Sequence, residues 1–379
     1  MEDMRKLIAI TAASLVLSLA ASAQGFSTSG WWEPAGPVFS PQVHSDRSVT
    51  FRLKAPKART VRLAFGEGDI LYKDMQEQRG IWEVTIGPVE PGVYEYKFEV
   101  DGLKMLDYPN PAVKAGTEIY CNTVEIKGDE PRFDERILTG SEIDVISYRS
   151  SALGTYRRVC IYVPAIYFEE PRRSFPVLYL RHGGGDHERS WWESAQADAI
   201  MDNAIAAGAT PMLVVMTNGL TDGSWAGGSS PEGMALLEKE LLSDVIPLVE
   251  KRYRVRKDRA SRAIAGLSMG GGQSFVIGLR NLDKFAWIGE FSSGLLSDPA
   301  LDLAPYGVTL DPATINKSLK LLWISCGTKD ERWEGHCAFD ALLTRNGIVH
   351  GFDSAPYAHQ WQFWREQLYT FAGRIFKNQ

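Results

Sequence analysis

The sequence predicts two domains, a small all-β sandwich followed by a larger α/β domain with a mostly parallel sheet. Three observations lead to this division. The 379 residues exceed one average domain, and a composition of 44% hydrophobic and 23% charged residues is that of a globular protein. Short segments of alternating apolar residues dominate the first part of the chain, without a helical period. From about Ile143 onward, apolar strand-like runs alternate with helical stretches, which is typical of a sheet buried on both faces.

The N-terminus has the pattern of a secretory signal peptide. The basic pair Arg5-Lys6 precedes the apolar run 7–20, and Ala21-Ser22-Ala23 forms an A-x-A cleavage site. A membrane anchor is the alternative, but the run is shorter than the ~20 residues that a bilayer requires. We therefore expect a signal peptide over residues 1–23 and a periplasmic or secreted mature chain, with no lipid anchor and no contact with a membrane.

The net charge and the pattern of cysteine residues limit the classes of ligand that the protein is expected to bind. The net charge of -6 gives no basic stripe for nucleic-acid phosphates, so we expect no nucleic-acid partner. The sequence has no Cys-x-x-Cys motif and no histidine-rich cluster, so it predicts no metal site. Of the four cysteines, only Cys326 and Cys337 are close in sequence; a disulfide between them and buried free thiols are both open.

Four segments of the first domain, at residues 38–127, have the alternation of half-buried strands: 48–53, 81–86, 94–100 and 122–126. The dipeptide Asp101-Gly102 suits a tight hairpin turn. Residues 128–142 lack periodicity and contain Gly128, Pro131 and Gly140, which indicates a linker. The second domain then spans residues 143–379.

The first domain also contains segments that match the sequence pattern of a known type of module. They are residues 48–56, 92–94, 101–102 and 107–110, together with Trp82 inside its strand. On these residues it resembles the immunoglobulin-like, family 48 type of carbohydrate-binding module. The resemblance implies an immunoglobulin-like sandwich. Trp82, Tyr94 and Tyr96 have faces that can stack on a sugar, but alternating aromatic residues are also typical of a sandwich core, so no sugar-contacting residue is assigned.

Residues 266–270, Gly-Leu-Ser-Met-Gly, match G-x-S-x-G, a sharp turn from strand to helix that lifts a serine hydroxyl above a sheet. The strand-like run 262–265 precedes this turn, and the run 270–277 is typical of a tightly packed helix. Small residues are needed because the turn leaves no room for side chains near the nucleophile. The motif predicts Ser268 as the nucleophile; the alternative is a glycine-rich turn with an incidental serine.

A serine hydroxyl needs a histidine base, which follows the acid in the chain order of this motif. His336 comes too soon after Ser268 to leave room for a strand between it and a preceding acid. His350 lies in a predicted final strand, 348–352. His359 follows that strand in a loop before the C-terminal helix, and we predict that it is the base.

The predicted strand 321–326 runs into Gly-Thr-Lys-Asp at 327–330. An aspartate just past the carboxyl end of a late parallel strand can reach the imidazole from the active edge of the sheet. We therefore predict Asp330 as the acid, with Glu331 and Glu334 as alternatives.

The tetrahedral intermediate needs backbone N–H groups aimed at its oxyanion. Met269, directly after the nucleophile, is expected to supply one of them. The strand-like run 178–181 continues into an HGGG-type loop, from which Gly183 or Gly184 is expected to supply the other. His182 precedes the nucleophile and is interpreted as a scaffold for that loop.

Several stretches of the second domain together match the sequence pattern of one known family: 181–186 with Trp191 soon after, 214–219, 266–271, 326–330 and 359–365. On these residues 143–376 resemble carbohydrate esterase family 1, the feruloyl and acetyl xylan esterases, within the esterase D and enterochelin-esterase-like group. The resemblance implies an α/β-hydrolase fold and a serine triad without a cofactor at Ser268, Asp330 and His359. Thr217 departs from a proline that is frequent in the family, which leaves the triad unaffected.

The resemblance implies hydrolysis of feruloyl or related hydroxycinnamoyl esters on plant cell-wall polysaccharide such as arabinoxylan. Candidates for the wall of the acyl pocket are the tryptophans near the predicted active edge: Trp191, Trp192, Trp225 and Trp361. Alternatives on the same scaffold are an acetyl xylan esterase, a siderophore esterase and an acyltransferase. A binding protein on an inactive hydrolase scaffold is disfavoured because all three triad positions are occupied.

Overall fold

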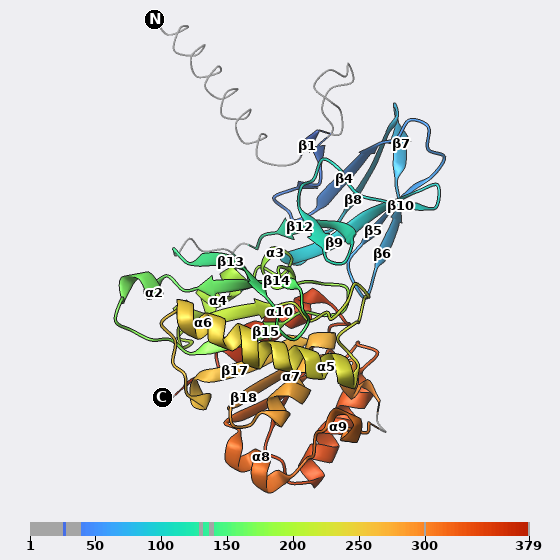
Figure 1. The fold of residues 1–379 in the computed structure, drawn as a ribbon. Helices are drawn as coiled ribbons and strands as arrows, with labels where there is room; N and C mark the ends of the chain where they lie inside the picture. Colours follow the sequence, from blue (N-terminus) through green and yellow to red (C-terminus); the bar gives the residue numbers. More distant parts are fainter. Residues whose placement is uncertain (1–25, 28–38, 129–131, 136–139, 299–300, 378–379) are drawn as a thin grey trace, which may run out of the picture. The chain divides into compact units, whose positions relative to one another are not determined.

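The computed structural model describes residues 26–27, 39–128, 132–135, 140–298 and 301–377 (Figure 1). The predicted signal peptide and parts of the predicted linker lie outside these residues. The chain divides into two compact units, which we describe separately. The first unit is Met1–Gly66, Ile70–Val113 and Cys121–Gly128, and the second is Glu67–Asp69, Lys114–Tyr120 and Asp129–Gln379. In the described part of the chain, no helix is both long and apolar enough to cross a bilayer.

The first unit consists of β-strands in two main sheets. One sheet has the order β3-β4-β8-β7, with bounds β3 (Gln42–Val43), β4 (Val49–Lys54), β7 (Gln76–Gln78) and β8 (Ile81–Ile86). The other has the order β11-β12-β9-β5-β6, with β10 paired to β9: β5 (Val61–Phe65), β6 (Leu71–Asp74), β9 (Gly92–Val100), β10 (Leu103–Met105), β11 (Val113–Ala115) and β12 (Ile119–Ile126). A short separate ribbon pairs β1 (Phe26–Ser27) with β2 (Phe39–Ser40).

The two sheets of the first unit share one apolar core, because alternate residues of each strand point inward. Phe51, Leu63 and Phe98 are fully buried in this core. Tyr96 and Trp82 are also buried there, so these two aromatic residues are core residues. The four predicted strands are confirmed, and so is the hairpin after β9.

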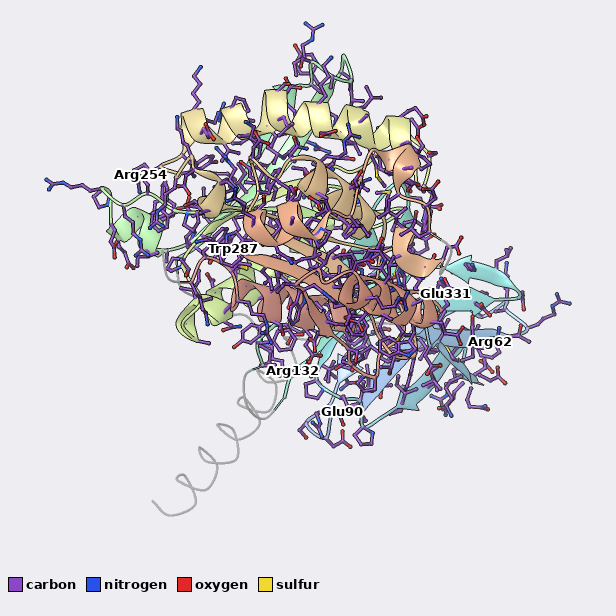
Figure 2. The ribbon with its side chains drawn as sticks, turned by 90° about the horizontal axis from the view of Figure 1, so that it is seen from below. Arg62, Glu90, Arg132, Arg254, Trp287 and Glu331 are labelled. Carbon is purple, nitrogen blue, oxygen red and sulfur yellow. The ribbon has the colours of Figure 1, made fainter. Side chains whose placement is uncertain are left out.

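The outer face of this unit carries an ion pair. Arg62, labelled in Figure 2, lies on β5, where it pairs with Glu99 at 2.5 Å and stacks over the ring of Tyr72 at 4.4 Å. Strand β5 was not predicted from the sequence.

The second unit is built on an eight-stranded sheet with the order β13-β14-β16-β15-β17-β18-β19-β20. Strands β13 and β14 are antiparallel to their neighbours, and the strands from β16 to β20 run parallel. Their bounds are β13 (Glu142–Arg149), β14 (Tyr156–Val163), β15 (Val177–Arg181), β16 (Leu213–Thr217), β17 (Arg262–Leu267), β18 (Trp287–Phe291), β19 (Leu321–Ser325) and β20 (Gly351–Asp353).

Helices cover both faces of this sheet and complete a three-layer α/β fold (Figure 1). Residues of α5, α6, α7, α8 and α9 pack on one face, and residues of α3, α4 and α10 pack on the other. The helices are α2 (Ile166–Glu169), α3 (Ser190–Glu193), α4 (Ala197–Ala206), α5 (Pro231–Glu240), α6 (Ile246–Arg252), α7 (Ser268–Arg280), α8 (Pro312–Ser318), α9 (Trp333–Arg345) and α10 (Trp361–Ala372). Strands β15 to β18 are buried along their whole length, as the sequence predicted for a sheet covered on both sides.

The predicted final strand begins only at Gly351, so His350 lies outside β20. The helical segment of residues 231–252 is continuous but contains a π-helical turn at Leu241–Val245. Pro247 lies just after this turn, where the wider helix accommodates its missing N–H.

Candidate active site

The turn between β17 and α7 places Ser268 at the first position of the helix. Its φ of 69° is in the left-handed region, which a residue with a side chain adopts at a cost of roughly 1–3 kcal/mol. Gly266 and Gly270 make this turn sterically allowed. A Cβ on Gly266 would lie 2.5 Å from the carbonyl oxygen of Gly270, and one on Gly270 would lie 2.3 Å from that of His182.

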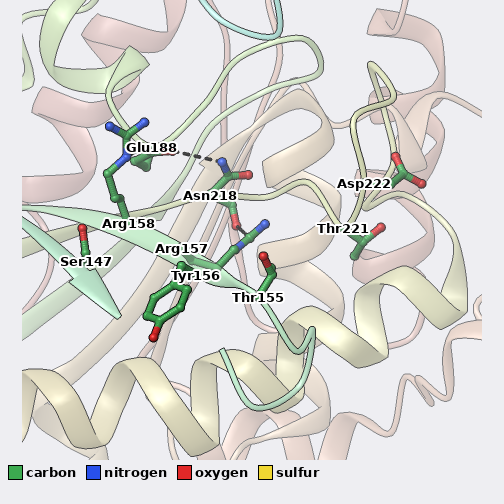
Figure 3. Close-up of a pocket in the computed structure, with 9 residues that line it drawn as sticks. All are labelled: Ser147, Thr155, Tyr156, Arg157, Arg158, Glu188, Asn218, Thr221 and Asp222. Atoms are coloured by element: carbon green, nitrogen blue, oxygen red, sulfur yellow. Dashed lines mark hydrogen bonds and ion pairs between the residues drawn. The ribbon is translucent and has the colours of Figure 1, made fainter. Parts of the chain in front are cut away.

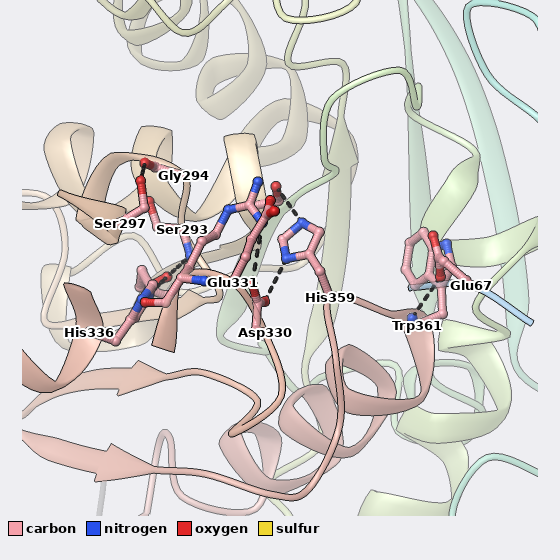
Figure 4. Close-up of polar contacts among 12 residues, drawn as sticks. Glu67, Ser293, Gly294, Ser297, Asp330, Glu331, His336, His359 and Trp361 are labelled. Carbon is pink, nitrogen blue, oxygen red and sulfur yellow. Dashed lines mark hydrogen bonds and ion pairs between the residues drawn. The ribbon is translucent and has the colours of Figure 1, made fainter. Parts of the chain in front are cut away.

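Ser268, His359 and Asp330 form a hydrogen-bonded chain. The Ser268 Oγ is 3.0 Å from His359 Nε2, and His359 Nδ1 is 2.6 Å from Asp330 Oδ2. Figure 4 shows Asp330 and His359 approaching each other from the loops that carry them. The three residues meet because β17, β19 and β20 are parallel and end at one edge of the sheet.

The carboxylate of Asp330 is held in one orientation. Its side chain is fully buried, and its Oδ1 accepts hydrogen bonds from the backbone N–H of Arg332 at 3.0 Å and from the Arg332 guanidinium at 3.3 Å. Burial raises the pKa of Asp330, but the hydrogen bond and charge of His359, together with Arg332, outweigh it and lower the pKa. Asp330 is therefore ionised at neutral pH, and its Oδ2 remains directed at His359.

The alternative acids do not reach the imidazole. Glu331 is 79% exposed and pairs with Arg332 at 2.8 Å, and Glu334 is exposed on α9. Asp330 is the carboxylate that hydrogen-bonds His359.

Two backbone segments lie beside the Ser268 side chain. Met269 lies in the first turn of α7, where N–H groups have no partner within the helix. Gly183 lies beside the nucleophile, since a Cβ on it would be 3.5 Å from Ser268 Cβ. A Cβ on Gly184 would lie 2.7 Å from the ring of Trp225, so this glycine packs against the indole.

His182 holds the glycine loop in place. Its Nε2 accepts a hydrogen bond from the N–H of Gly219 at 2.8 Å, which leaves the proton on Nδ1 to be donated to the carbonyl of Gly183 at 2.8 Å. Burial lowers the pKa of His182 to about 4, so the ring is neutral. This arrangement is the scaffold that the sequence suggested.

Buried polar residues that sequence reasoning missed extend this scaffold. Gln273 on α7 donates to the carbonyls of Gly219 at 2.8 Å and Gly228 at 3.0 Å, and accepts from the Arg181 guanidinium at 3.1 Å. This network ties the loop that carries Trp225 to the helix that begins at Ser268. No local sequence pattern signals it, because its members are far apart in the chain.

Two short segments of the second unit, Glu67–Asp69 and Lys114–Tyr120, were also missed. Glu67 accepts a hydrogen bond from the backbone N–H of Trp361 at 3.0 Å, at the start of α10 and two residues after His359 (Figure 4). Lys114 pairs with the same carboxylate at 3.1 Å. Thr117 donates from its backbone to the carbonyl of Gly185 at 2.7 Å. These contacts brace both the loop of the base and the glycine loop.

The four candidate tryptophans have different environments. Trp191 and Trp361 are 1% and 2% exposed and pack edge to face at 5.2 Å in the apolar core, so the expectation that they line the acyl pocket is wrong. Trp192 is half-buried beneath the guanidinium of Arg189. Trp225 is 60% exposed over the glycine loop and remains available to a ligand.

Other candidates from the sequence have structural partners. His350 bonds Asp340 at 2.8 Å, and His336 bonds Glu290 at 3.1 Å. Cys326 and Cys337 are both thiols, so the disulfide between them is not formed. Among the described residues, no cluster of three or more His, Cys, Asp or Glu side chains is arranged to hold a metal ion.

The buried pair His336–Glu290 makes stability depend on pH. Burial alone lowers the pKa of His336, but the charge of Glu290 raises it to about 11, well above the ~6.5 of an unfolded chain. The folded protein keeps a proton that the unfolded chain loses, so the stabilisation is complete below about pH 6.5 and declines by at most ~1.4 kcal/mol per pH unit toward pH 11. We expect the Tm of the wild type to fall between about pH 7 and pH 10, as measured by calorimetry.

The matched control is the double variant Glu290→Gln/His336→Gln, which keeps two groups that can hydrogen-bond but removes both charges. Its Tm is expected to lack this component of the pH dependence. An identical decline in both proteins would contradict a protonated His336.

Comparison with known proteins gives one family and several relatives. The family model named Esterase matches residues 150–375. An endo-1,4-beta-xylanase/feruloyl esterase from Xylanibacter ruminicola is 30% identical over 348 residues, which are 89% of this chain and 46% of the relative. Endo-1,4-beta-xylanase Y from Acetivibrio thermocellus is 27% identical over 138 residues, which are 34% of this chain and 12% of the relative. The chain therefore spans less than half the length of these two relatives.

Solved structures agree with the fold. A ferulic acid esterase is 26% identical with a TM-score of 0.53, and the match covers 63% of this chain and 99% of that chain. The enterobactin esterase of Shigella flexneri has a TM-score of 0.64 at 15% identity, covering 86% of this chain and 92% of that chain. These neighbours identify the second unit as an α/β-hydrolase fold.

Proposed function

Because the chain belongs to the Esterase family, we propose that it hydrolyses carboxylic esters through an acyl-enzyme on Ser268. The observation that carries this proposal is the continuous hydrogen-bonded chain from Ser268 through His359 to Asp330. In the first step His359 takes the proton of the Ser268 hydroxyl, whose oxygen attacks the ester carbonyl. Asp330 holds the imidazole in the tautomer that accepts this proton and stabilises the imidazolium that forms.

The remaining steps use the same groups. The N–H of Met269 and that of Gly183 or Gly184 bind the oxyanion, and each such donor is worth about 2.7–4 kcal/mol in the barrier. The imidazolium of His359 then protonates the leaving alkoxide, which leaves the acyl group on Ser268. A water molecule deprotonated by His359 attacks the acyl-enzyme and releases the acid. No metal and no organic cofactor enters this scheme.

We further propose that the substrates are feruloyl or related hydroxycinnamoyl esters of plant cell-wall polysaccharide. Two observations support this substrate class: the 30% identical relative is named a xylanase/feruloyl esterase, and Trp225 exposes an apolar ring beside the glycine loop. A flat aromatic acyl group gains from such a wall, whereas an acetyl group does not. Half-buried Trp192 is the second candidate for this wall.

The first unit is proposed to be an immunoglobulin-like carbohydrate-binding module of the family 48 type. Residues 1–23 are proposed to be a signal peptide that directs the protein to the periplasm or the exterior. Both proposals rest on the sequence patterns described above. Removal of residues 24–127 would be an unsuitable test of the module, because it also removes Glu67 and Lys114, which belong to the second unit.

A comparison of substrates tests the proposed specificity. We expect kcat/KM for methyl ferulate to exceed that for an acetyl ester of matched leaving group by about thirtyfold, since burying an aromatic group against one apolar wall is worth ~2 kcal/mol. Trp225→Ala should remove most of this advantage and leave acetyl hydrolysis nearly unchanged. Phe168→Ala, which removes another exposed aromatic side chain of the second unit, is the control.

Other outcomes would redirect the assignment. A preference for acetylated xylan would make the protein an acetyl xylan esterase, and a preference for a catecholate siderophore would make it a siderophore esterase, whose solved relative shares the fold over 86% of this chain. Transfer of the acyl group to an added sugar in place of water would identify an acyltransferase.

A further inference from the structure

A cavity opens in the second unit, and none of its lining residues belongs to the triad. Its volume is about 490 Å³, within the usual range for binding sites of small ligands. Figure 3 shows the side chains that surround it. They are Ser147, Thr155, Tyr156, Arg157, Arg158, Glu188, Asn218, Thr221 and Asp222.

The cavity lies at the same edge of the sheet as the triad. Strand β14 runs antiparallel to β16, and Val159 pairs with Thr217, so the start of β14 lies beside the carboxyl end of β16. Tyr156 and Arg158 are therefore at the edge where Ser268 emerges. Three strand spacings separate β14 from β17 in the order β14-β16-β15-β17, which is about 14 Å at ~4.8 Å per spacing. A chain-like substrate bound at the triad can reach this distance.

The charges that line the cavity are balanced. The Arg157 guanidinium bonds both carboxylate oxygens of buried Glu240, at 3.1 and 3.2 Å. Arg158 pairs with Glu188 at 3.1 Å, and the side chain of Glu188 is only 4% exposed. Because each arginine already has a carboxylate partner, the cavity offers no net positive charge to an anion. This balance favours a neutral ligand over a phosphate or a uronic acid.

Hydrogen bonds within the protein hold the side chains that line the cavity in place without a ligand. Arg157 also donates to the carbonyls of Leu220 at 2.6 Å and Asn218 at 2.8 Å, which anchors the loop after β16. The Asn218 amide donates to Glu188 at 3.0 Å. Such preorganised polar groups lose little freedom on binding.

The chemistry of the cavity suits a sugar. The hydroxyl groups of Ser147 and Thr155 can exchange hydrogen bonds with sugar hydroxyls. The Thr221 hydroxyl, which already donates to the Gly227 carbonyl, and the Asp222 carboxylate can accept hydrogen bonds from them. Tyr156 is 78% exposed, so its ring offers a flat apolar face at the opening of the cavity. A neutral sugar ring presents both an apolar face and a polar rim, and it matches this combination.

We propose that this cavity binds neutral sugar residues of the polysaccharide chain that carries the ester, on the alcohol side of the scissile bond. The proposal rests on the proposed function in naming that chain as the ligand. It assigns to Tyr156 and its neighbours a role in recognising the glycan, separate from recognition of the acyl group by Trp225.

Tyr156→Ala tests the proposal, with Phe168→Ala as the control. Both side chains are exposed, and Phe168 lies on α2, which follows the opposite end of β14. Because Tyr156 would contact only the sugar, Tyr156→Ala is expected to lower kcat/KM for a feruloylated arabinoxylo-oligosaccharide by about fivefold or more, without changing that for methyl ferulate. Phe168→Ala should change neither. An equal loss on both substrates, or no loss on either, would overturn the proposal.

A binding measurement separates this proposal from the proposed function. Calorimetric titration of Ser268→Ala with unesterified arabinoxylo-oligosaccharide needs no turnover, so it is informative even if the wild type does not hydrolyse ferulate. Binding that is weakened in Ser268→Ala/Tyr156→Ala supports the sugar site. Absent binding, binding that the second substitution does not affect, or tighter binding of a uronate-bearing oligosaccharide would overturn it.

Discussion

Ser268→Ala is expected to lower kcat for methyl ferulate by a factor on the order of 10⁶, because the proposed nucleophile is lost. A fluorophosphonate should label the wild type at Ser268 and leave the variant unlabelled, as read by mass spectrometry of the intact protein. Some acceleration over the uncatalysed reaction should remain, since the proposed oxyanion donors of Met269 and the glycine loop are unchanged in this variant.

Ser274→Ala is the matched control for this experiment. Ser274 lies on the same helix and is fully buried, but no hydrogen bond connects it to His359. The activity of the Ser274→Ala variant should stay within about twofold of that of the wild type, since the substitution leaves the triad unchanged. Turnover that survives in Ser268→Ala would contradict the acyl-enzyme scheme.

His359→Ala is expected to reduce kcat by nearly as much, about 10⁵–10⁶, because the members of a triad act as a unit. Without the imidazole, the Ser268 hydroxyl has no base, and Asp330 Oδ2 loses its hydrogen bond to His359. The measurement is steady-state hydrolysis of methyl ferulate, with circular dichroism to verify that the variant is folded.

His350→Ala provides the comparison. His350 also hydrogen-bonds an aspartate, Asp340, at 2.8 Å. The Ser268 hydroxyl, however, hydrogen-bonds His359. The activity of the His350→Ala variant should be close to that of the wild type. A larger loss in His350→Ala than in His359→Ala would reassign the base.

The fold was predictable where burial and local pattern agree. Strands β15, β17 and β19 are short apolar runs, and each was located from the sequence. Strand β18 was missed because Gly289 and Glu290 interrupt its apolar pattern. Glu290 is tolerated there because His336, 46 positions later, and the backbone N–H of Ser293 bond its buried carboxylate. A single-sequence pattern cannot reveal such a partner.

The residues of the candidate site were also only partly predictable from the sequence. Ser268 and His359 were identified because a local motif and the order of the chain restrict them strongly. Exposure is not encoded locally, and Trp191 and Trp361 were therefore mistaken for pocket residues. The support from Gln273 was also missed, since it joins loops more than 40 positions away through hydrogen bonds to backbone carbonyls.

The left-handed backbone conformation of Ser268 lowers the stability of the fold, whereas the proposed activity needs the serine side chain at this position. A glycine there would relax the turn, since glycine adopts such a φ without penalty, and it would also delete the nucleophile. Ser268→Gly is therefore expected to raise the free energy of unfolding while it removes the proposed nucleophile. The residue that the proposed reaction needs is thus not the residue that this backbone conformation favours.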